Sequence, residues 1–210
     1  MTTEIEIVNR ALGRIGEALL TSLSDSNERA RLARLELVTS KQYILRRANW
    51  NFATRWVELA VECDNCDKNP SFDYTYQVPN DCVLVQAVKH PSRDATVTTV
   101  YDTGLRNVDR YEVNGIYVSC NINPALIRYT KDVDLGQWSI DATEALSWHL
   151  AASLCNAFSR SAETRQFCEL KYQEAYNVAQ NTDAKEGTHD RFQTDNRLTG
   201  TRVAGHRVGW

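Results

Sequence analysis

The stretch from Ala145 to Ser159 carries no fully charged residue, and it constrains the fold more than any other part of the chain. A helix that is apolar all round must be buried all round. We predict a helix over 142–159 that has two apolar faces. One face holds Leu146, Leu150, Leu154 and Ala157, and the other holds Ala145, Trp148, Ala152 and Cys155. We expect the second face to be covered either by a neighbouring subunit, with Trp148, Ala152 and Cys155 as interface candidates, or by the β part of the same chain.

Three further segments repeat apolar residues at helical spacing and predict helices at 3–17, 26–48 and 162–182. The first is expected to stop at Gly16, and the second to begin after a cap at Asp25 or Ser26. The predicted buried stripes are Ile5, Val8, Leu12 and Ile15; then Ala30, Ala33, Leu37, Ile44 and Ala48; then Phe167, Cys168, Tyr172, Ala175, Val178 and Ala179.

Between these helices the period changes to two. Residues 72–78 alternate apolar and polar side chains, as a half-buried strand does, and Asn114-Gly115 is a preferred pair for a tight hairpin. Further strands are expected at 82–88, 95–101, 110–113, 116–120 and 126–130. The sequence therefore predicts an α+β fold: mainly a helical bundle of about four helices, with a small antiparallel β insertion at about 72–130. This domain occupies 1–182, and an extended C-terminal tail follows over 183–210.

Charge and hydropathy exclude several classes of protein. A net charge of −3 and a pI of about 5.8 argue against a dedicated nucleic-acid binder, which usually carries a basic surface. No apolar run reaches the roughly 20 residues that cross a bilayer, and the N-terminus lacks the pattern of a signal peptide. We expect a protein that is made in a cytoplasm and has no membrane partner.

Neither the thiols nor the titratable groups form a recognisable reactive site. The six cysteines are interpreted as free thiols, because a chain of this length with this many core residues does not need disulfides. Cys63 and Cys66 have the spacing of zinc ligands but lack a second ligand pair. His149 lies within the apolar helix, where a histidine of the core or of an interface is the simpler interpretation. We predict no enzyme activity, no catalytic residue, no metal and no cofactor.

Three motifs follow one another in the first quarter of the chain. Residues 11–16 read ALGRIG, residues 22–30 read SLSDSNERA, and residues 50–53 read WNFA, which we call the WNFA motif. Together with Val78-Pro79-Asn80-Asp81-Cys82 and Ile127-Arg128-Tyr129, the series resembles the head-to-tail adaptor family of tailed bacteriophages, also called tail tubular protein A. Members show "ALxxIG", then "SLxxxSxxA", then "WNFA". The resemblance covers roughly residues 3–182.

The resemblance implies a virion structural protein at the head-tail junction, made in the host bacterial cytoplasm. Such adaptors are helical bundles with a small β insertion, and they form a ring of twelve copies beneath the portal ring of the capsid. A downstream tail or nozzle protein docks below, and the viral DNA passes through the lumen. The C-terminal extension of these proteins embraces the portal subunits. The corresponding portal-binding candidates here are Arg191, Phe192, Arg197, Arg202, Arg207 and Trp210.

Two other functions remain open from the sequence. One is a tail-associated enzyme that degrades peptidoglycan, since some adaptors of this kind have been proposed to act on it. The other is a different head-completion or stopper ring protein of a long-tailed phage. No pair of carboxylates stands out for glycan hydrolysis, so the sequence favours the adaptor.

Overall fold

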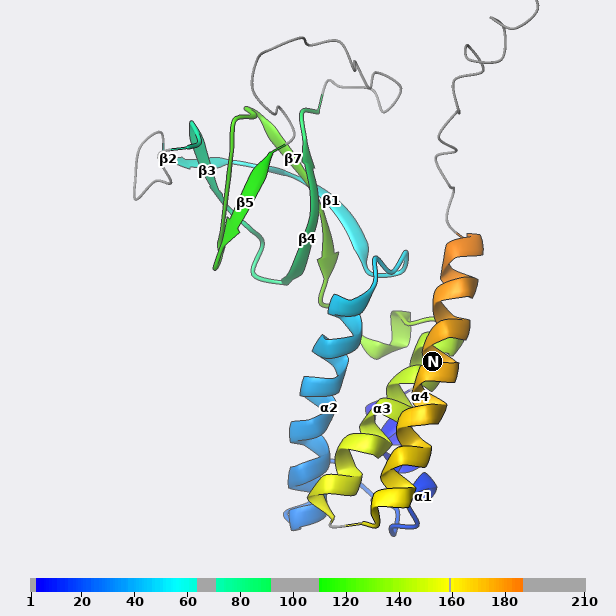
Figure 1. The fold of residues 1–210 in the computed structure, drawn as a ribbon. Helices are drawn as coiled ribbons and strands as arrows, with labels where there is room; N and C mark the ends of the chain where they lie inside the picture. Colours follow the sequence, from blue (N-terminus) through cyan, green and yellow to red (C-terminus); the bar gives the residue numbers. More distant parts are fainter. Residues whose placement is uncertain (1–2, 64–70, 92–109, 159, 187–210) are drawn as a thin grey trace, which may run out of the picture.

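The computed structural model describes residues 3–63, 71–91, 110–158 and 160–186. It shows four helices and two small antiparallel sheets, which confirms the predicted α+β class. The helices form a bundle, and the strands form a β module at one end of it (Figure 1). The predicted strand at 95–101 and the residues after 186 lie outside the described ranges.

The first two helices begin at side-chain caps. Helix α1, Glu4–Arg14, starts from a capping box in which Thr3 and Glu6 exchange hydrogen bonds, and Gly16 follows its end with a φ of 72°. Helix α2, Glu28–Arg47, is capped by Asn27, whose Oδ1 accepts from the backbone N–H of Ala30 at 2.7 Å. The predicted cap at Asp25 or Ser26 was therefore wrong, because the side chain that reaches the free N–H groups of the first turn belongs to Asn27.

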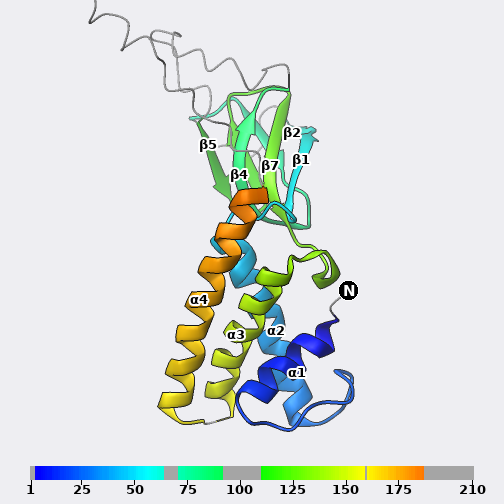
Figure 2. The same cartoon turned by 90° about the vertical axis from the view of Figure 1, so that its right-hand side faces the viewer.

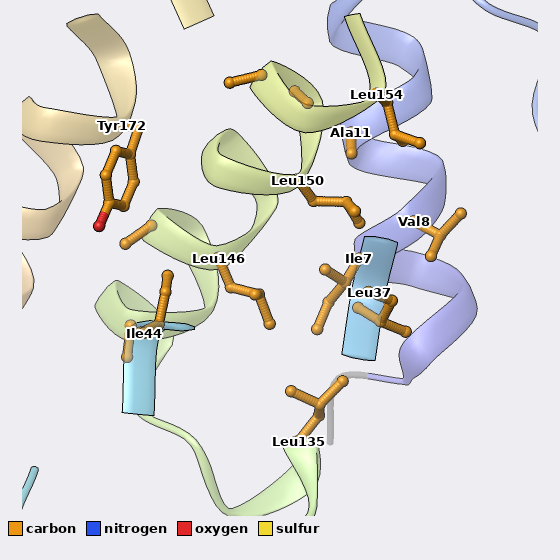
Figure 3. Close-up of a cluster of buried hydrophobic side chains, with 14 of the residues drawn as sticks. Ile7, Val8, Ala11, Leu37, Ile44, Leu135, Leu146, Leu150, Leu154 and Tyr172 are labelled. Carbon is orange, nitrogen blue, oxygen red and sulfur yellow. The ribbon is translucent and has the colours of Figure 1, made fainter. Parts of the chain in front are cut away.

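The charge-free segment forms α3, Ile140–Ala157, at the centre of the bundle (Figure 2). One of its faces packs on α1 and α2, and Figure 3 shows Leu146, Leu150 and Leu154 within that apolar cluster. The other face packs on α4, Ala162–Glu186. Burial on both sides was correctly predicted, but the cover is a fourth helix of the same chain.

This arrangement removes the reason for assigning Trp148, Ala152 and Cys155 to a subunit interface. Ala152 and Cys155 are buried inside the single chain. Trp148 is half-buried; its Nε1 donates to Glu144 Oε1 at 2.9 Å, and the Arg14 guanidinium lies 3.7 Å from the centre of its ring. These contacts satisfy all three residues without a second copy.

The buried stripe of α4 differs from the predicted one. Cys168, Tyr172, Tyr176 and Ala179 are buried, whereas Phe167 and Val178 are more than half exposed. The four buried residues recur every three or four positions and share one face, which Phe167 and Val178 flank. The sequence pattern predicted more buried residues than the structure shows, because α4 is buried on one side only.

The described residues of the β module form seven strands. Strands β1 (Thr54–Leu59), β7 (Ala125–Lys131) and β4 (Cys82–Lys89) form one sheet in that order. The second sheet has the order β2 (Val61–Cys63), β3 (Tyr74–Gln77), β6 (Tyr117–Cys120) and β5 (Tyr111–Asn114). All pairs are antiparallel, and the predicted hairpin at Asn114-Gly115 joins β5 to β6 with a Gly115 φ of 63°. The β region thus begins at residue 54, earlier than the predicted 72.

The β module has its own apolar core and is joined to the bundle by specific polar contacts. Tyr76 is fully buried in that core, and its hydroxyl donates to the carbonyl oxygen of Ile122 at 2.6 Å. Where the two parts meet, Lys41 of α2 pairs with Asp132 at 2.6 Å, and Arg46 donates to the carbonyl oxygen of Val83. Within the described ranges, none of the helices combines the length and apolar character needed to cross a bilayer.

Candidate functional site

The WNFA motif lies where α2 leaves the bundle and β1 begins. The carbonyl oxygen of Trp50 accepts from the backbone N–H groups of Ala53 at 3.2 Å and Thr54 at 2.9 Å, which folds the segment into a turn. Trp50, Asn51 and Phe52 alternate apolar and polar side chains, a pattern that favours an extended segment. The turn forms instead because both aromatic rings face the same apolar cluster.

Three aromatic contacts make the motif a plug for the end of the bundle. The fully buried Trp50 stacks on Phe52, with ring centroids 5.6 Å apart, and meets the edge of Tyr176 of α4 at 5.9 Å. Phe52 lies 5.3 Å from Trp138, which follows the short 3-10 helix η1, Leu135–Gln137. The Trp50 Nε1 donates to the carbonyl oxygen of Ile44 at 2.8 Å, so its polar atom is satisfied. The plug joins α2, α4 and the segment that leads into α3.

Asn51 ties the same turn to the last part of α4. Its backbone N–H donates to both carboxylate oxygens of Asp183, at 3.0 and 3.2 Å, and its Nδ2 donates to the Asp183 carbonyl oxygen at 2.5 Å. Burial raises the pKa of the Asp183 carboxyl, while the hydrogen bond from Asn51 lowers it. The end of α4, from which residues 187–210 continue, is therefore held to the WNFA motif.

A second cluster lies between α2, α3 and α4 and centres on Arg47. Its Nη1 donates to the hydroxyls of Tyr43 at 2.8 Å and Tyr172 at 3.3 Å, and the guanidinium lies 4.9 Å from the Tyr176 ring centre. His149 stacks on Tyr43 at 4.5 Å and meets the edge of Tyr172 at 5.0 Å. Sequence reasoning missed this cluster, although Tyr43–Arg47 and Tyr172–Tyr176 both have the i,i+4 spacing of neighbours on a helix.

His149 is a packed histidine here, as expected. Burial, and to a lesser degree Arg47, lowers its pKa from 6.5 to about 4, and its buried Nδ1 has no hydrogen-bond partner. Its ring contacts in the described chain, stacking on Tyr43 and an edge contact with Tyr172, are those of a packed side chain. Burial also raises the pKa of Tyr172 to about 12, so this hydroxyl stays protonated beside Arg47.

The depressed pKa predicts a loss of stability in acid. Between pH 6.5 and about 4 the unfolded chain binds a proton at His149 that the folded chain does not, so the free energy of unfolding falls as the pH falls through this window. Discounted for partial exposure, the loss is about 2 kcal/mol. Denaturant unfolding from about pH 7 to about pH 4 should show this excess slope in the natural chain and not in His149→Gln. Equal slopes in both chains would contradict it.

The remaining predicted positions divide between confirmed and undescribed ones. Cys82, Cys120, Cys155 and Cys168 are free thiols, as predicted. Cys66 and the Cys63 side chain lie outside the described part, as do Arg191, Phe192, Arg197, Arg202, Arg207 and Trp210. Across the described ranges, no group of three or more His, Cys, Asp or Glu is placed to hold a metal ion.

What these residues do together is mechanical: they fix the relative positions of two helices, the first strand and the start of the C-terminal segment. No family model matches this chain. No curated protein matches it either. The contact between Asn51 and Asp183, which we call the Asn51–Asp183 joint, links the WNFA motif to the end of α4.

Proposed function

We propose that this chain is a virion structural protein of a tailed bacteriophage, an adaptor that joins the portal vertex of the capsid to the tail. Copies assemble into a ring of twelve under the portal, receive the next tail or nozzle protein below, and line part of the channel through which the DNA passes. The role is structural and not enzymatic. The observation that carries the proposal is the joint between Asn51 of the WNFA motif and Asp183 at the root of the C-terminal segment.

The first two motifs of the resemblance each have a structural part in this fold, which supports the proposal. Ala11, Leu12 and Ile15 of the first motif are buried, and its Gly16 has the positive φ that ends the helix. The "SLxxxSxxA" pattern has serine where this chain has Asn27, the residue that caps α2. Serine and asparagine are both good N-caps, so the departure keeps the physical role.

The joint also explains how such an adaptor would hold a partner firmly. In the proposal, residues 187–210 reach the portal from the end of α4 beside the β module (Figure 1). A binding segment with a fixed starting point searches a smaller volume, which reduces the entropy lost on docking.

Co-sedimentation of the full chain with its portal ring tests the proposal: saturable binding is expected. A zymogram on peptidoglycan is expected to stay uncleared, and clearing would contradict the non-enzymatic role.

The free protein is expected to be mainly monomeric or weakly associating, and to form the ring only on the portal. Both faces of α3 are covered within one chain, so folding does not require a second copy. The mean hydropathy of the whole chain is −0.47, so polar side chains outweigh apolar ones in its composition. Mass photometry of the isolated protein is the measurement. A stable ring of twelve in the absence of portal would rule out template-dependent assembly, although not the adaptor role.

A further inference from the structure

Helix α4 carries an apolar stripe that is largely exposed in the described chain. Phe167, Leu170 and Val178 are each more than half exposed. Glu163 and Glu174 complete the row at spacings of four, three, four and four, so the five side chains share one helix face. Most of that face lies opposite the buried stripe of Cys168, Tyr172, Tyr176 and Ala179, and Phe167, which flanks the stripe, meets the ring of Trp148 of α3 edge-on at 6.0 Å.

Helix α2 carries a matching row. Leu35 and Val38 are each more than half exposed, and Arg31 and Gln42 extend the row at spacings of four, three and four. Ile44, which is fully buried, is nine positions from Leu35 and so on the opposite side of the helix. The row therefore faces away from the bundle core.

The two rows lie on opposite flanks of the molecule and run in the same direction. Figure 1 shows α2 and α4 on either side of α3, and the colours show that both start at the end of the bundle remote from the β module. From that end the order on α2 is a charge at Arg31 followed by Leu35 and Val38. On α4 it is a charge at Glu163 followed by Phe167 and Leu170.

The charges at the start of the two rows have opposite signs. Arg31, with 65% of its side chain exposed, makes a long contact of 3.8 Å to Glu28, which is 80% exposed and precedes it on the same face. The exposed Arg34 lies beside the row, so this end of α2 carries two arginines against one carboxylate. Glu163 is exposed at the start of α4. Glu174 is 58% exposed and pairs with Lys171. When Leu35 and Val38 are aligned with Phe167 and Leu170, the carboxylate that faces the arginines is therefore that of Glu163. Two identical outer rows would bring like charges together, whereas α2 against α4 brings opposite charges together.

We propose that these rows are the contact between neighbouring copies: the outer face of α2 in one copy packs in parallel against the outer face of α4 in the next. Leu35 and Val38 interdigitate with Phe167 and Leu170, and Arg31 and Arg34 lie against Glu163. Because the two surfaces differ and lie on opposite flanks, the contact is head-to-tail and closes into a ring when the rotation between copies permits. This contact deepens the proposed function and rests on it for the closure of the ring.

Site-directed cross-linking tests the pairing. Val38→Cys and Leu170→Cys are prepared as separate chains, mixed at the highest soluble concentration, and treated with a short bismaleimide; the natural chain is the control for its own thiols. Cross-linked dimer above the control is expected in the mixture and not in either variant alone. The same mixture is also treated on portal rings, where the copies are brought together. Dimer in Leu170→Cys alone would show an α4–α4 contact and overturn the proposal, as would a mixture that stays at the level of the control both alone and on portal rings.

Charge reversal adds a test that does not depend on folding defects, since both positions are exposed. Arg31→Glu in the Val38→Cys chain should lower the yield of cross-linked dimer about three- to fivefold, the change expected for a surface ion pair. When this chain is mixed with a Leu170→Cys chain that also carries Glu163→Arg, the yield of cross-linked dimer should be restored. Cross-linking without portal binding would leave the contact and remove the adaptor role. Portal binding without the α2–α4 cross-link would leave the adaptor role and remove the proposed contact.

Discussion

Deleting residues 187–210 is expected to abolish attachment to the portal ring while the rest of the chain folds with nearly unchanged stability. In the described part of the chain both apolar cores are built from residues between Ile7 and Ala179, and the truncated chain keeps all of these residues. The joint between Asn51 and Asp183 also remains. Thermal unfolding of the truncated chain checks the first half of this prediction, and co-sedimentation with portal rings checks the second.

The expected loss of attachment is large because many contacts are lost at once. Arginine and tryptophan anchors cost about 2 kcal/mol or more each when truncated at a buried interface, and about 1.4 kcal/mol already changes an affinity tenfold. Copies joined in one ring multiply the effect through avidity. Arg202→Ala combined with Trp210→Ala should weaken portal binding without a change in melting temperature. A truncated chain that still co-sediments at full stoichiometry would transfer the docking role to the helical body.

Trp50→Ala is expected to be among the most destabilising single substitutions in the chain. The side chain is fully buried, contacts Phe52 and Tyr176, and satisfies its Nε1 on Ile44. Its removal leaves a cavity where α2, α4 and the start of the β module meet. A buried tryptophan truncated to alanine costs about 3–5 kcal/mol, which corresponds to a fall of roughly 10 °C in melting temperature for a chain of this size.

Trp56→Ala is the matched control for that substitution. Trp56 lies six positions further on, in β1, is 46% exposed, and has Lys89 Nζ 4.1 Å from its ring centre. Its truncation removes a surface cation–π contact and should cost about 1 kcal/mol or less. Denaturant unfolding of the two variants gives the comparison. Equal losses would mean that the WNFA plug is not a centre of stability.

Local periodicity was enough to predict the helices and most of the described strands. The charge-free segment predicted a helix covered on two sides, and Asn114-Gly115 predicted its hairpin. The identity of the cover for α3 could not be predicted, because the interface candidates Trp148 and Cys155 look equally apolar whether α4 or a second copy packs on them. The exposed Phe167 was misassigned for the same reason: helical spacing does not tell which of two adjacent stripes faces the core.

Contacts between distant segments were out of reach of the sequence. Strand β1 was missed because it pairs with β7, some seventy residues later, and its own residues show no clean alternation. The Asn51–Asp183 joint spans 132 positions and involves residue types that are common on surfaces. The motif at Trp50 stands out in the sequence, and in the structure its rings pack at the end of the bundle. That it also holds the root of the C-terminal segment required the three-dimensional arrangement.

Electron microscopy of the full chain mixed with its portal ring tests the adaptor proposal most directly. Side views of the portal ring should gain one added layer, and top views of that layer should show twelve repeats around a central channel. The truncated chain lacking 187–210 serves as the control and should leave the portal views unchanged. Portal rings without an added layer, at concentrations where the full chain is in excess, would contradict the adaptor role.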